Sequence, residues 1–339
     1  MKDSVRTKLK ASASGQSMRK RQSPKRKSLK KKEQVQKKQL PKVVIAETEY
    51  ETADIEATAN ILFKPNPGPQ TAFLAASERE VLYGGSAGGG KSYAMLADPL
   101  RYMGHPQFSG LLLRHTTEEL RELIFKSQEL YPKIWPGIKW SERKMQWTAP
   151  SGARLWMSYL DRDDDVLRYQ GLAFSWIGFD ELTQWSSSYA WNYMRSRLRS
   201  TAPDLPIYMR ATTNPGGRGH SWVKKTFIDP SPYDKSFDAT DTDTAEVLRY
   251  PAGHIKAGKP LFKRRFIPAR LSDNPYLSEG GDYEAMLLSL PEQQRRQLLE
   301  GDWDIKEGAA FTEFNRDIHV VEPFKIPSNW VKFRACDYG

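Results

Sequence analysis

The feature that most constrains the fold is the run Gly-Ser-Ala-Gly-Gly-Gly-Lys-Ser at residues 85–92. It has the spacing G-x-x-x-x-G-K-[ST] of a phosphate-binding loop, which connects a strand to a helix. The apolar run 81–83 upstream suits a strand, and residues 93–97 downstream suit a helix. A glycine-rich turn with a surface lysine is the alternative, but both flanks favour the loop. The run therefore predicts an α/β fold that binds a nucleotide.

Each part of this loop has an expected role. Glycines let the backbone approach phosphate oxygens closely, so that its amides bind them. Lys91 should reach the β and γ phosphates, where it is also a candidate catalytic residue, and the Ser92 hydroxyl should bind Mg²⁺. The predicted nucleotide-binding residues of the loop are Gly85, Gly88, Gly89, Gly90, Lys91 and Ser92.

A phosphate-binding loop needs an acidic partner at the end of a neighbouring strand, and residues 174–181 have this form. Asp180 is expected to hold Mg²⁺, directly or through water, and Glu181 to orient and deprotonate the attacking water. Separate carboxylates for the metal and for the proton favour a hydrolase over a small-molecule kinase. An ordinary strand terminus is the alternative for this pair. We find no Asn-Lys-x-Asp segment for binding guanine, so ATP is favoured over GTP.

Between residues 80 and 212, runs of β-type residues alternate with helical stretches. The predicted strands are 81–83, 110–114, 154–159, 175–179 and 207–212, and the predicted helices follow Lys91 and cover 118–130 and about 190–199. This alternation predicts a P-loop NTPase fold, with a mostly parallel sheet flanked by helices. After about residue 220 the chain is richer in proline, with a helical patch at 282–300, so we expect a small linker subdomain there.

The 339 residues contain 52 Lys and Arg against 41 Asp and Glu, a net charge of +11. The first 42 residues alone hold 16 basic and two acidic residues, so the remainder carries −3. The net charge therefore describes an N-terminal arm and does not argue that the folded part binds nucleic acid. We expect residues 1–42 to be a disordered basic arm. A solvated tail, transient contact with DNA phosphates and a localisation signal stay open as its role.

The single cysteine, Cys336, excludes a disulfide framework and any zinc site built on several thiolates, and it favours a reducing compartment. No run approaches the roughly 18 apolar residues needed to span a bilayer. The N-terminus lacks the apolar core of a secretory signal. The sequence therefore predicts an intracellular protein with no membrane partner.

The motifs together resemble the large terminase subunit of tailed bacteriophages, the ATP-driven motor that packages DNA into a procapsid. The resemblance covers about residues 65–339 and rests on the order and spacing of several short segments. These segments are Gly68-Pro69-Gln70, 83–92, Arg168-Tyr169-Gln170-Gly171, 179–183, Ser196-Arg197-Leu198-Arg199, 211–217, 219–224, Asp273-Asn274-Pro275-Tyr276 and 299–303.

The resemblance assigns roles to three residues outside the loop and the acidic pair. It implies that Gln70 hydrogen-bonds the adenine edge, although an amide here also suits a solvated loop. Thr213 and Asn214 follow the predicted strand 207–212, where the family's coupling motif senses the γ-phosphate and relays hydrolysis to movement. A turn before Pro215 is the alternative for this pair.

An arginine finger is also implied. Arg168 matches the position from which some family members insert an arginine into the neighbouring subunit's site, where it stabilises transition-state charge. Arg114 and Arg197 are competing candidates, and a solvent-facing Arg168 is the alternative. The family and this trans-acting arginine imply a homo-oligomeric ring on the portal.

The strand-like run 331–336 leads into Asp337, two residues before the sequence ends. In the family, a similar strand opens an RNase H-like nuclease domain, and its terminal aspartate is the first of several carboxylates that bind two metal ions. Since one carboxylate cannot clamp two metals, we expect an incomplete nuclease site, no nuclease activity from this chain alone, and a truncated, split or partially sequenced subunit. The expected domains are the arm at 1–42, the P-loop ATPase core at 43–220, the ATPase C-terminal part and linker at 221–328, and the start of the nuclease domain at 329–339.

The leading hypothesis is a Mg²⁺-dependent ATPase that moves double-stranded viral DNA into the procapsid, in the host cytoplasm and transiently at the procapsid portal vertex. The resemblance implies the terminase small subunit and the portal protein as partners. A non-catalytic truncated module that binds ATP or DNA, and a helicase-like DNA-stimulated ATPase, are the alternatives. DNA would be gripped by its phosphates without sequence readout. The candidate contacts are Arg218, Lys224, Lys225 and Lys263-Arg264-Arg265.

Overall fold

The computed structural model of the protein describes residues 63–231, 233–305 and 325–331. The predicted arm at 1–42 lies outside the described residues. So does most of the predicted nuclease segment, Asp337 included. All the other predicted site residues are described, so their mutual placement follows from the structure.

One nine-stranded mixed sheet forms the centre of the described part, with the order β3-β4-β5-β2-β6-β7-β1-β9-β8. Its strands are β1 (Glu80–Gly85), β2 (Ser109–Arg114), β3 (Lys139–Ser141), β4 (Gln146–Thr148), β5 (Arg154–Tyr159), β6 (Trp176–Asp180), β7 (Tyr208–Thr213), β8 (Ser236–Asp238) and β9 (Lys263–Ala269). The central strands from β5 to β9 in this order pair in parallel, and both edges are antiparallel. The predicted α/β class with a mostly parallel sheet is confirmed.

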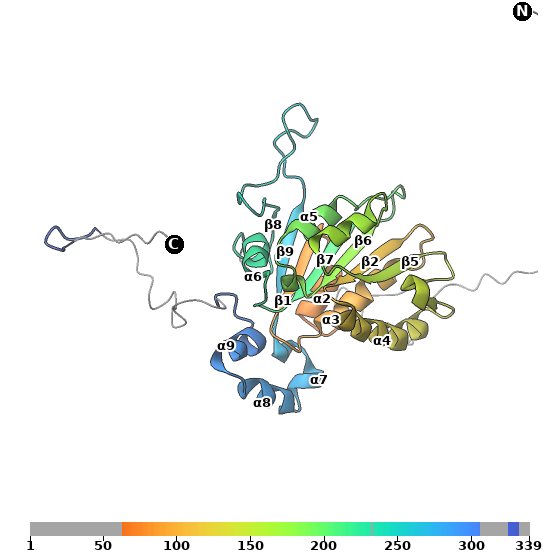
Figure 1. The fold of residues 1–339 in the computed structure, drawn as a ribbon, viewed down its shortest axis with the longest axis horizontal. Helices are drawn as coiled ribbons and strands as arrows, with labels where there is room; N and C mark the ends of the chain where they lie inside the picture. The colour runs from red at the N-terminus through yellow and green to blue at the C-terminus, as the bar shows by residue number, and fades with distance from the viewer. Residues whose placement is uncertain (1–62, 232, 306–324, 332–339) are drawn as a thin grey trace, which may run out of the picture. The chain divides into compact units, whose positions relative to one another are not determined.

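Helices cover both faces of this sheet, with α2, α3 and α4 on one face and α5 and α6 on the other (Figure 1). The α-helices are α2 (Pro69–Ala75), α3 (Lys91–Ala97), α4 (Thr117–Ile134), α5 (Tyr189–Arg195), α6 (His220–Val223), α7 (Pro275–Ser278), α8 (Asp282–Leu288) and α9 (Glu292–Arg295). Shorter helical turns are η1 (Asp98–Tyr102), η2 (Glu142–Lys144), η3 (Asp163–Tyr169), η4 (Leu182–Gln184), η5 (Lys224–Ile228), η6 (Leu271–Asp273) and η7 (Arg296–Glu300). None of the helices in the described ranges has the length and apolar character needed to cross a bilayer.

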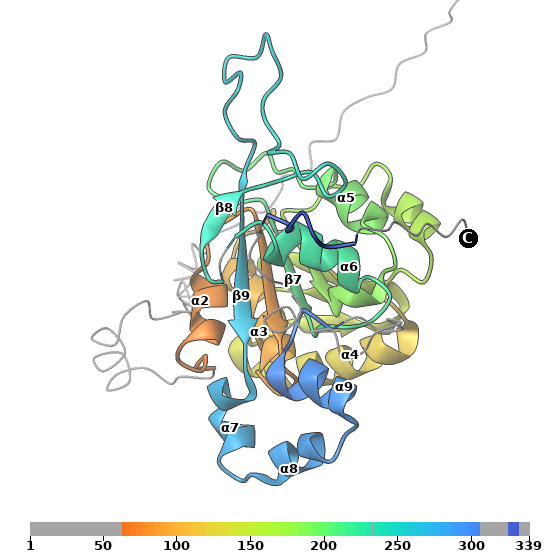
Figure 2. The same cartoon turned by 90° about the vertical axis from the view of Figure 1, so that its left-hand side faces the viewer.

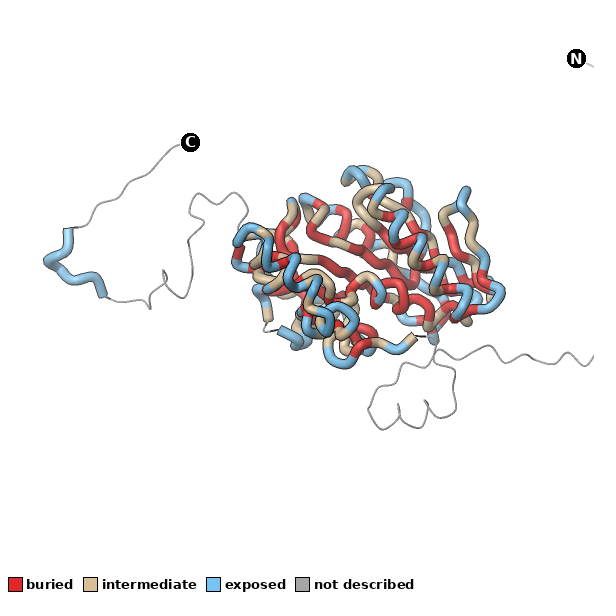
Figure 3. The backbone as a smooth tube through the Cα atoms, turned by 90° about the horizontal axis from the view of Figure 1, so that it is seen from below, coloured by how far each residue is buried: buried red, intermediate tan, exposed pale blue. Residues whose placement is uncertain are grey.

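Two apolar cores form because successive side chains of a strand point to opposite faces of the sheet. In β1, Val81 and Tyr83 join the core under α2, α3 and α4, whereas Leu82 joins the core under α5. Every residue of β1 is buried, as expected for a parallel strand covered on both faces. Figure 3 shows the resulting arrangement, with buried backbone segments inside and more exposed segments around them.

Two predicted helices are shorter than expected. The helix predicted near 190–199 ends at Arg195, because the backbone of Arg197 and Arg199 hydrogen-bonds Phe174 instead, at 3.0 Å each. The patch at 282–300 consists of α8, α9 and η7, with Pro291 immediately before α9. Proline cannot supply the backbone N–H that a continuous helix needs, so one long helix does not form.

Strand β9 was missed by the sequence analysis, which treated Lys263–Arg265 as a candidate DNA contact. The structure corrects this for Arg264: β9 pairs in parallel with β1, and the Arg264 side chain is only 1% exposed. Arg264 is buried because its guanidinium neutralises the buried carboxylate of Glu80. The basic residues hid a strand whose other side chains, such as Phe266 and Ile267, are apolar and buried.

The Glu80 carboxylate ties three elements together at the amino end of the sheet. Its Oε2 accepts from Arg264 Nε of β9 at 2.7 Å, and its Oε1 accepts from Arg195 Nε of α5. Burial opposes the charged carboxylate, but Arg264 and Arg195 hold the pKa of Glu80 below its ordinary value. A buried carboxylate is tolerated only when it is paired and hydrogen-bonded in this way.

Replacing Glu80 by alanine should destabilise the fold by about 3–5 kcal/mol, because it leaves the Arg264 guanidinium buried without its partner. Chemical denaturation of the parent and variant measures this difference. Lys263→Ala is the matched control in the same strand, since its ion pair with Asp238 is exposed and should contribute less than about 1 kcal/mol. Equal losses in the two variants would contradict a structural role for the buried pair.

Candidate active site

The candidate site lies where three parallel strands end. The phosphate-binding loop follows β1, Thr213 and Asn214 come at the end of β7, and Asp180 and Glu181 come at the end of β6. The sequence predicted that the acidic pair would end a strand next to β1, but β7 lies between β6 and β1. The groups still meet, because parallel strands end at one edge and neighbouring strands are only about 4.8 Å apart.

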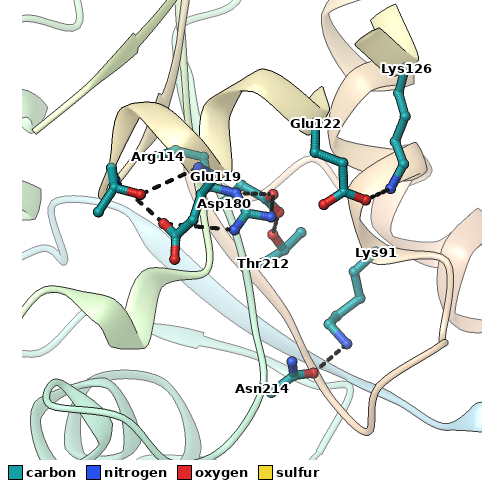
Figure 4. Close-up of polar contacts among 9 residues, drawn as sticks. Lys91, Arg114, Glu119, Glu122, Lys126, Asp180, Thr212 and Asn214 are labelled. Carbon is teal, nitrogen blue, oxygen red and sulfur yellow. Dashed lines mark hydrogen bonds and ion pairs between the residues drawn. The ribbon is translucent and has the colours of Figure 1, made fainter. Parts of the chain in front are cut away.

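Lys91 is buried at the centre of this edge, with 6% of its surface exposed. Its Nζ donates to the Ser86 carbonyl at 2.6 Å and to Asn214 Oδ1 at 2.8 Å (Figure 4). Burial lowers the pKa of Lys91, and the negative charges of Glu181 and Asp180 act in the opposite direction. The structure therefore brings together the predicted lysine, both predicted carboxylates and one of the two predicted coupling residues.

Side chains from outside the loop hold its carbonyl groups. Asn274 Nδ2 donates to the Gly88 carbonyl at 2.6 Å, and the Tyr83 hydroxyl donates to the Gly89 carbonyl at 2.7 Å. The amides of the glycines at 88, 89 and 90 donate to no other described residue. These amides remain available for an anion, which is the arrangement that phosphate oxygens require.

Two glycines of the loop have a backbone conformation or a close contact that favours glycine. Gly85 has φ +140°, and a Cβ there would lie 2.3 Å from the Ala269 carbonyl oxygen of β9. Gly88 has φ +78°, and a Cβ there would lie 2.7 Å from Leu271 Cδ1. At Gly85 the backbone of β9 leaves no room for a larger residue, and at Gly88 the positive φ favours glycine, so the loop fits the predicted phosphate cradle.

Gln70 is almost fully buried and lies against this loop. Its Nε2 donates to the Gly90 carbonyl at 2.9 Å, and its Oε1 accepts from the backbone of Asn66 at 2.6 Å. This excludes a solvated loop residue, one of the two interpretations drawn from the sequence. The amide fastens the entry segment to the loop, and contact with adenine stays a prediction.

Asp180 is fully buried and held from two sides. Arg114 donates to its Oδ2 through Nε at 2.8 Å and through Nη2 at 2.7 Å, and Thr212 hydrogen-bonds its Oδ1. Burial opposes the charge of Arg114, but Asp180, Glu181 and Glu119 hold its pKa above the ordinary value. The Arg114 side chain is only 11% exposed and pairs with Asp180 of its own chain.

Glu181 is the second carboxylate and differs from Asp180 in two ways. It adopts φ +59°, a left-handed backbone conformation that is uncommon outside glycine. Burial and the neighbouring Asp180 charge raise its pKa, against the opposing effects of Lys91 and Arg114. A raised pKa makes this carboxylate a better proton acceptor, which suits a general base.

Thr213 and Asn214 connect the loop to the segment after Glu181. The hydroxyls of Thr213 and Thr183 lie 2.7 Å apart, and Thr183 Oγ1 donates to the Asn214 carbonyl at 3.2 Å. On its other side, Asn214 accepts from Lys91. The pair is thus more than a turn before Pro215. It contacts Thr183, which follows β6, and Lys91, which belongs to the loop after β1.

Arg168 is not brought to this site by any contact among the described residues. It lies in η3, with its side chain 48% exposed, and it pairs with Asp165 at 3.2 Å and the Tyr159 carbonyl at 3.1 Å. Arg197 is half-buried and stays near its own helix, over the Tyr193 ring. The solvent-facing alternative is therefore what the single chain shows for Arg168.

Segments after residue 270 contact the phosphate-binding loop. Sequence analysis offers no physical reason for these segments, which stand out only by their resemblance to the family. The Ala87 amide donates to the Leu298 carbonyl at 2.6 Å, and a Cβ on Gly301 would lie 2.7 Å from the Ser86 nitrogen. Asn274, noted above, comes from the same part of the chain. The segments at 273–276 and 299–303 thus pack directly against the loop. In the sequence, only the resemblance indicated that they are important.

The predicted Mg²⁺ ligands among the described residues are Ser92 and Asp180. The described ranges 63–231, 233–305 and 325–331 contain no group of three or more His, Cys, Asp or Glu residues placed to hold a metal ion by themselves. An ion held jointly by Ser92, Asp180 and phosphate oxygens needs no such group. Arg114 and Thr212 occupy about three of the four lone-pair positions of the Asp180 carboxylate, so one position on Oδ1 remains.

The sheet order, the glycine loop and the facing carboxylates define a P-loop NTPase. The family model described as "Terminase large subunit, T4likevirus-type, N-terminal" matches residues 82–318, which is most of the chain. The chain therefore belongs to this family of large terminase subunits. A search of curated proteins gives no match.

Solved structures of phage large terminases match this chain at low sequence identity. The large terminase of a thermophilic bacteriophage is 16% identical with a TM-score of 0.51, over 78% of this chain and 60% of that chain. The same protein in complex with ATP-gamma-S is 16% identical with a TM-score of 0.49, over 76% and 58%. The ATPase domain of the Thermus phage P74-26 large terminase is 12% identical with a TM-score of 0.44, over 76% and 98%. This chain spans about three fifths of the thermophilic phage terminase chain that it matches.

Gly85→Ala should destabilise the protein by at least about 2 kcal/mol, because the new methyl group would overlap the Ala269 backbone of β9. Gly281→Ala is the control: Gly281 also has a positive φ, of +70°, but no atom lies within 4 Å of the place its new methyl group would take, so the cost should be about 1 kcal/mol. Thermal or denaturant unfolding compares the two. A loss in Gly85→Ala no larger than in the control would contradict the close approach of loop and strand.

Proposed function

We propose that the chain hydrolyses ATP and is the motor part of a phage terminase that moves double-stranded DNA into the procapsid. The observation that carries the proposal is the buried Lys91 ammonium, bonded to Asn214 and lying within the electrostatic reach of Asp180 and Glu181. Family membership supports DNA packaging as the purpose of hydrolysis. The motor activity is a property of the whole terminase, and this chain spans only part of the length of the thermophilic phage relative.

Phosphate binding is assigned to the loop. The amides of residues 88–90 and the ammonium of Lys91 supply positive partners for the β and γ phosphates, and Gln70 is proposed to contact adenine. Ser92 and the remaining lone pair of Asp180 are proposed to hold Mg²⁺. When bound, Mg²⁺ would neutralise phosphate charge during the transfer.

Glu181 is proposed to act on the attacking water. Its raised pKa lets it accept a proton from the water as the oxygen bonds to the γ-phosphorus and the bond to the bridging oxygen breaks. Lys91 would stabilise the charge that spreads over the transferred group. Arg168, exposed on the chain that carries it, is proposed to complete the site of a neighbouring copy in a ring.

Coupling to movement is assigned to Thr213 and Asn214. Loss of the γ-phosphate would change what Lys91 contacts, and Asn214 shares a hydrogen bond with that ammonium. Asn214 in turn accepts from Thr183, in the segment that follows Glu181. A change at the phosphate would therefore be transmitted to the segment after β7, which holds Asn214, and to the segment after β6, which holds Thr183.

The partners follow from the family. We propose a homo-oligomeric ring on the portal protein, working with the terminase small subunit on double-stranded DNA in the host cytoplasm. The domain boundaries near 42, 220 and 328 remain part of the proposal. Nuclease activity is not assigned to this chain, because Asp337 and its surroundings lie outside the described residues.

Two variants test the hydrolysis proposal. Glu181→Gln should lower the ATP turnover rate about 10²–10⁴-fold while ATP binding persists, because only the proton acceptor is lost. Lys91→Ala should weaken ATP binding as well, because the buried phosphate partner is lost. Phosphate release and fluorescent-nucleotide binding, with and without duplex DNA, separate the two effects.

Glu122→Gln is the matched control for Glu181→Gln, because this exposed glutamate of α4 pairs with Lys126 and should be silent (Figure 4). If the purified parent hydrolyses no more ATP than the two site variants, the chain is a non-catalytic module and the proposal is wrong. Unwinding of a forked duplex by the parent would instead favour the helicase-like alternative.

The pH dependence of hydrolysis offers an independent test. Glu181 must be ionised to accept a proton, so turnover should fall as the pH drops through its raised pKa. Arg114 lowers that pKa, so Arg114→Gln should move the acid limb of the pH profile to higher pH, whatever the overall loss of rate. Lys126→Ala, which removes a half-buried cation of α4 that pairs with Glu122, should leave the limb in place. An acid limb at unchanged or lower pH in Arg114→Gln would refute Glu181 as the titrating base.

A further inference from the structure

The connection from β8 to β9 forms a separate two-stranded ribbon that projects from the sheet in both views (Figures 1 and 2). Its ladder joins residues 248–250 to residues 259–261: the Tyr250 amide donates to the Lys259 carbonyl at 3.0 Å, and the Leu261 amide donates to the Leu248 carbonyl at 2.9 Å. We call residues 247–262 the hairpin. Its ladder gives the projection a defined shape, unlike an open loop.

The outer part of this hairpin carries only positive charge. Residues 247–262 contain no Asp or Glu, and their cations are Arg249, Lys256 and Lys259. None of these three cations forms an ion pair with another described residue. The acidic residues Asp241, Asp243 and Glu246 all lie before the hairpin, in a turn where the Asp243 and Thr244 amides donate to Asp241 Oδ1. The positive charges are thus separated from the negative ones along the projection.

The tip of the hairpin is exposed and partly preorganised. Every residue from 251 to 259 is exposed, and Ile255 is 96% exposed. Behind the tip, the rings of Tyr250 and His254 stack with centroids 4.5 Å apart, and Lys256 Nζ lies 5.7 Å from the Tyr250 ring centre. Arg249 donates to the Gly258 carbonyl at 2.8 Å, which also links the two strands. These contacts therefore restrain the backbone that carries the three cations.

The hairpin lies at the end of β9 opposite the phosphate-binding loop. It joins β9 at Lys263, whereas Ala269 at the other end of that strand touches Gly85. Six residue steps of about 3.3 Å place these ends roughly 20 Å apart. The hairpin is therefore outside the candidate active site, and its charges have no role in holding ATP.

We propose that the hairpin at residues 247–262 is a contact surface for the phosphate backbone of double-stranded DNA, with Arg249, Lys256 and Lys259 as the contacting cations. The choice of DNA as the polyanion rests on the proposed motor function. The major groove of a DNA duplex is wide enough for a two-stranded ribbon, and lysine and arginine bind phosphates without reading sequence. A motor that must pass every sequence needs such contacts, and they replace Arg264 among the candidates drawn from the sequence.

The salt dependence of DNA binding tests this surface. The full chain is titrated against a fluorescein-labelled 30-base-pair duplex of mixed sequence, without nucleotide, between 50 and 200 mM KCl. Neutralising the three cations together as Arg249→Ala, Lys256→Ala and Lys259→Ala should reduce the slope of log K against log salt by about 2.7, at roughly 0.9 per lost phosphate contact. Fourfold more salt should then weaken the parent about 40-fold more than the variant.

The matched control neutralises three exposed cations at the other edge of the sheet, as Lys139→Ala, Arg143→Ala and Lys144→Ala. It should keep the parent slope, since this cluster also contains Glu142. An unchanged slope in the hairpin variant, an equal change in the control, or a change seen with an RNA duplex and not with DNA would overturn the proposal. Binding is measured without ATP, so this outcome is independent of whether the chain hydrolyses ATP.

A cross-linking measurement separates the hairpin from the basic arm at 1–42, which is present in every variant. In a Cys336→Ser background, Ile255→Cys carries a photoactivated cross-linker at the tip, and Arg143→Cys carries it at the control edge. Cross-links to the duplex should form from the tip position and not from the control position. Cross-links that are absent from the tip, or equal at both positions, would rule out the hairpin as the contact.

Discussion

The candidate site depends on one buried positive charge. Lys91 is withdrawn from water, and an ammonium in that position is stable only when partners replace its hydration. The Ser86 carbonyl and Asn214 supply hydrogen bonds, and the carboxylates of Asp180 and Glu181 supply opposite charge. These partners follow or end three separate strands. The contacts that stabilise the Lys91 ammonium therefore hold the ends of β1, β7 and β6 close to one another.

A second buried charge holds the opposite end of the same sheet. Glu80 opens β1 and joins Arg264 of β9 and Arg195 of α5, while at the other end of β1 the backbone of Gly85 approaches Ala269 of β9. The strand pair is thus fixed by ion pairing at one end and by close backbone packing at the other. A site carried on strands held at both ends keeps its geometry better than one carried on loops. The hairpin at 247–262 extends from this same strand.

The elements that the sequence predicted well have a local signal. Strand β5 was predicted with its bounds, and β2, β6 and β7 were predicted to within about one residue, because their apolar runs are bounded by polar segments. Strand β9 was missed, since Lys263, Arg264 and Arg265 begin it and the reason for burying Arg264 lies 184 residues away at Glu80. The placement of β7 between β6 and β1 was missed for a similar reason, as no local pattern encodes strand order.

The sequence by itself determined the chemistry of this protein: a glycine loop with Lys91 and Ser92, an Asp-Glu pair after an apolar strand, and a chain that alternates strands with helices. Those patterns depend only on residues that are close along the chain, so they are legible without a structure. The tertiary structure alone decided that Arg114 holds Asp180, that Gln70 fastens the loop, that Asn214 reaches Lys91, and that a basic hairpin stands apart from the candidate active site. Such pairings follow from which distant segments the sheet brings together, and the free energy of burying a charge or a polar group selects among them.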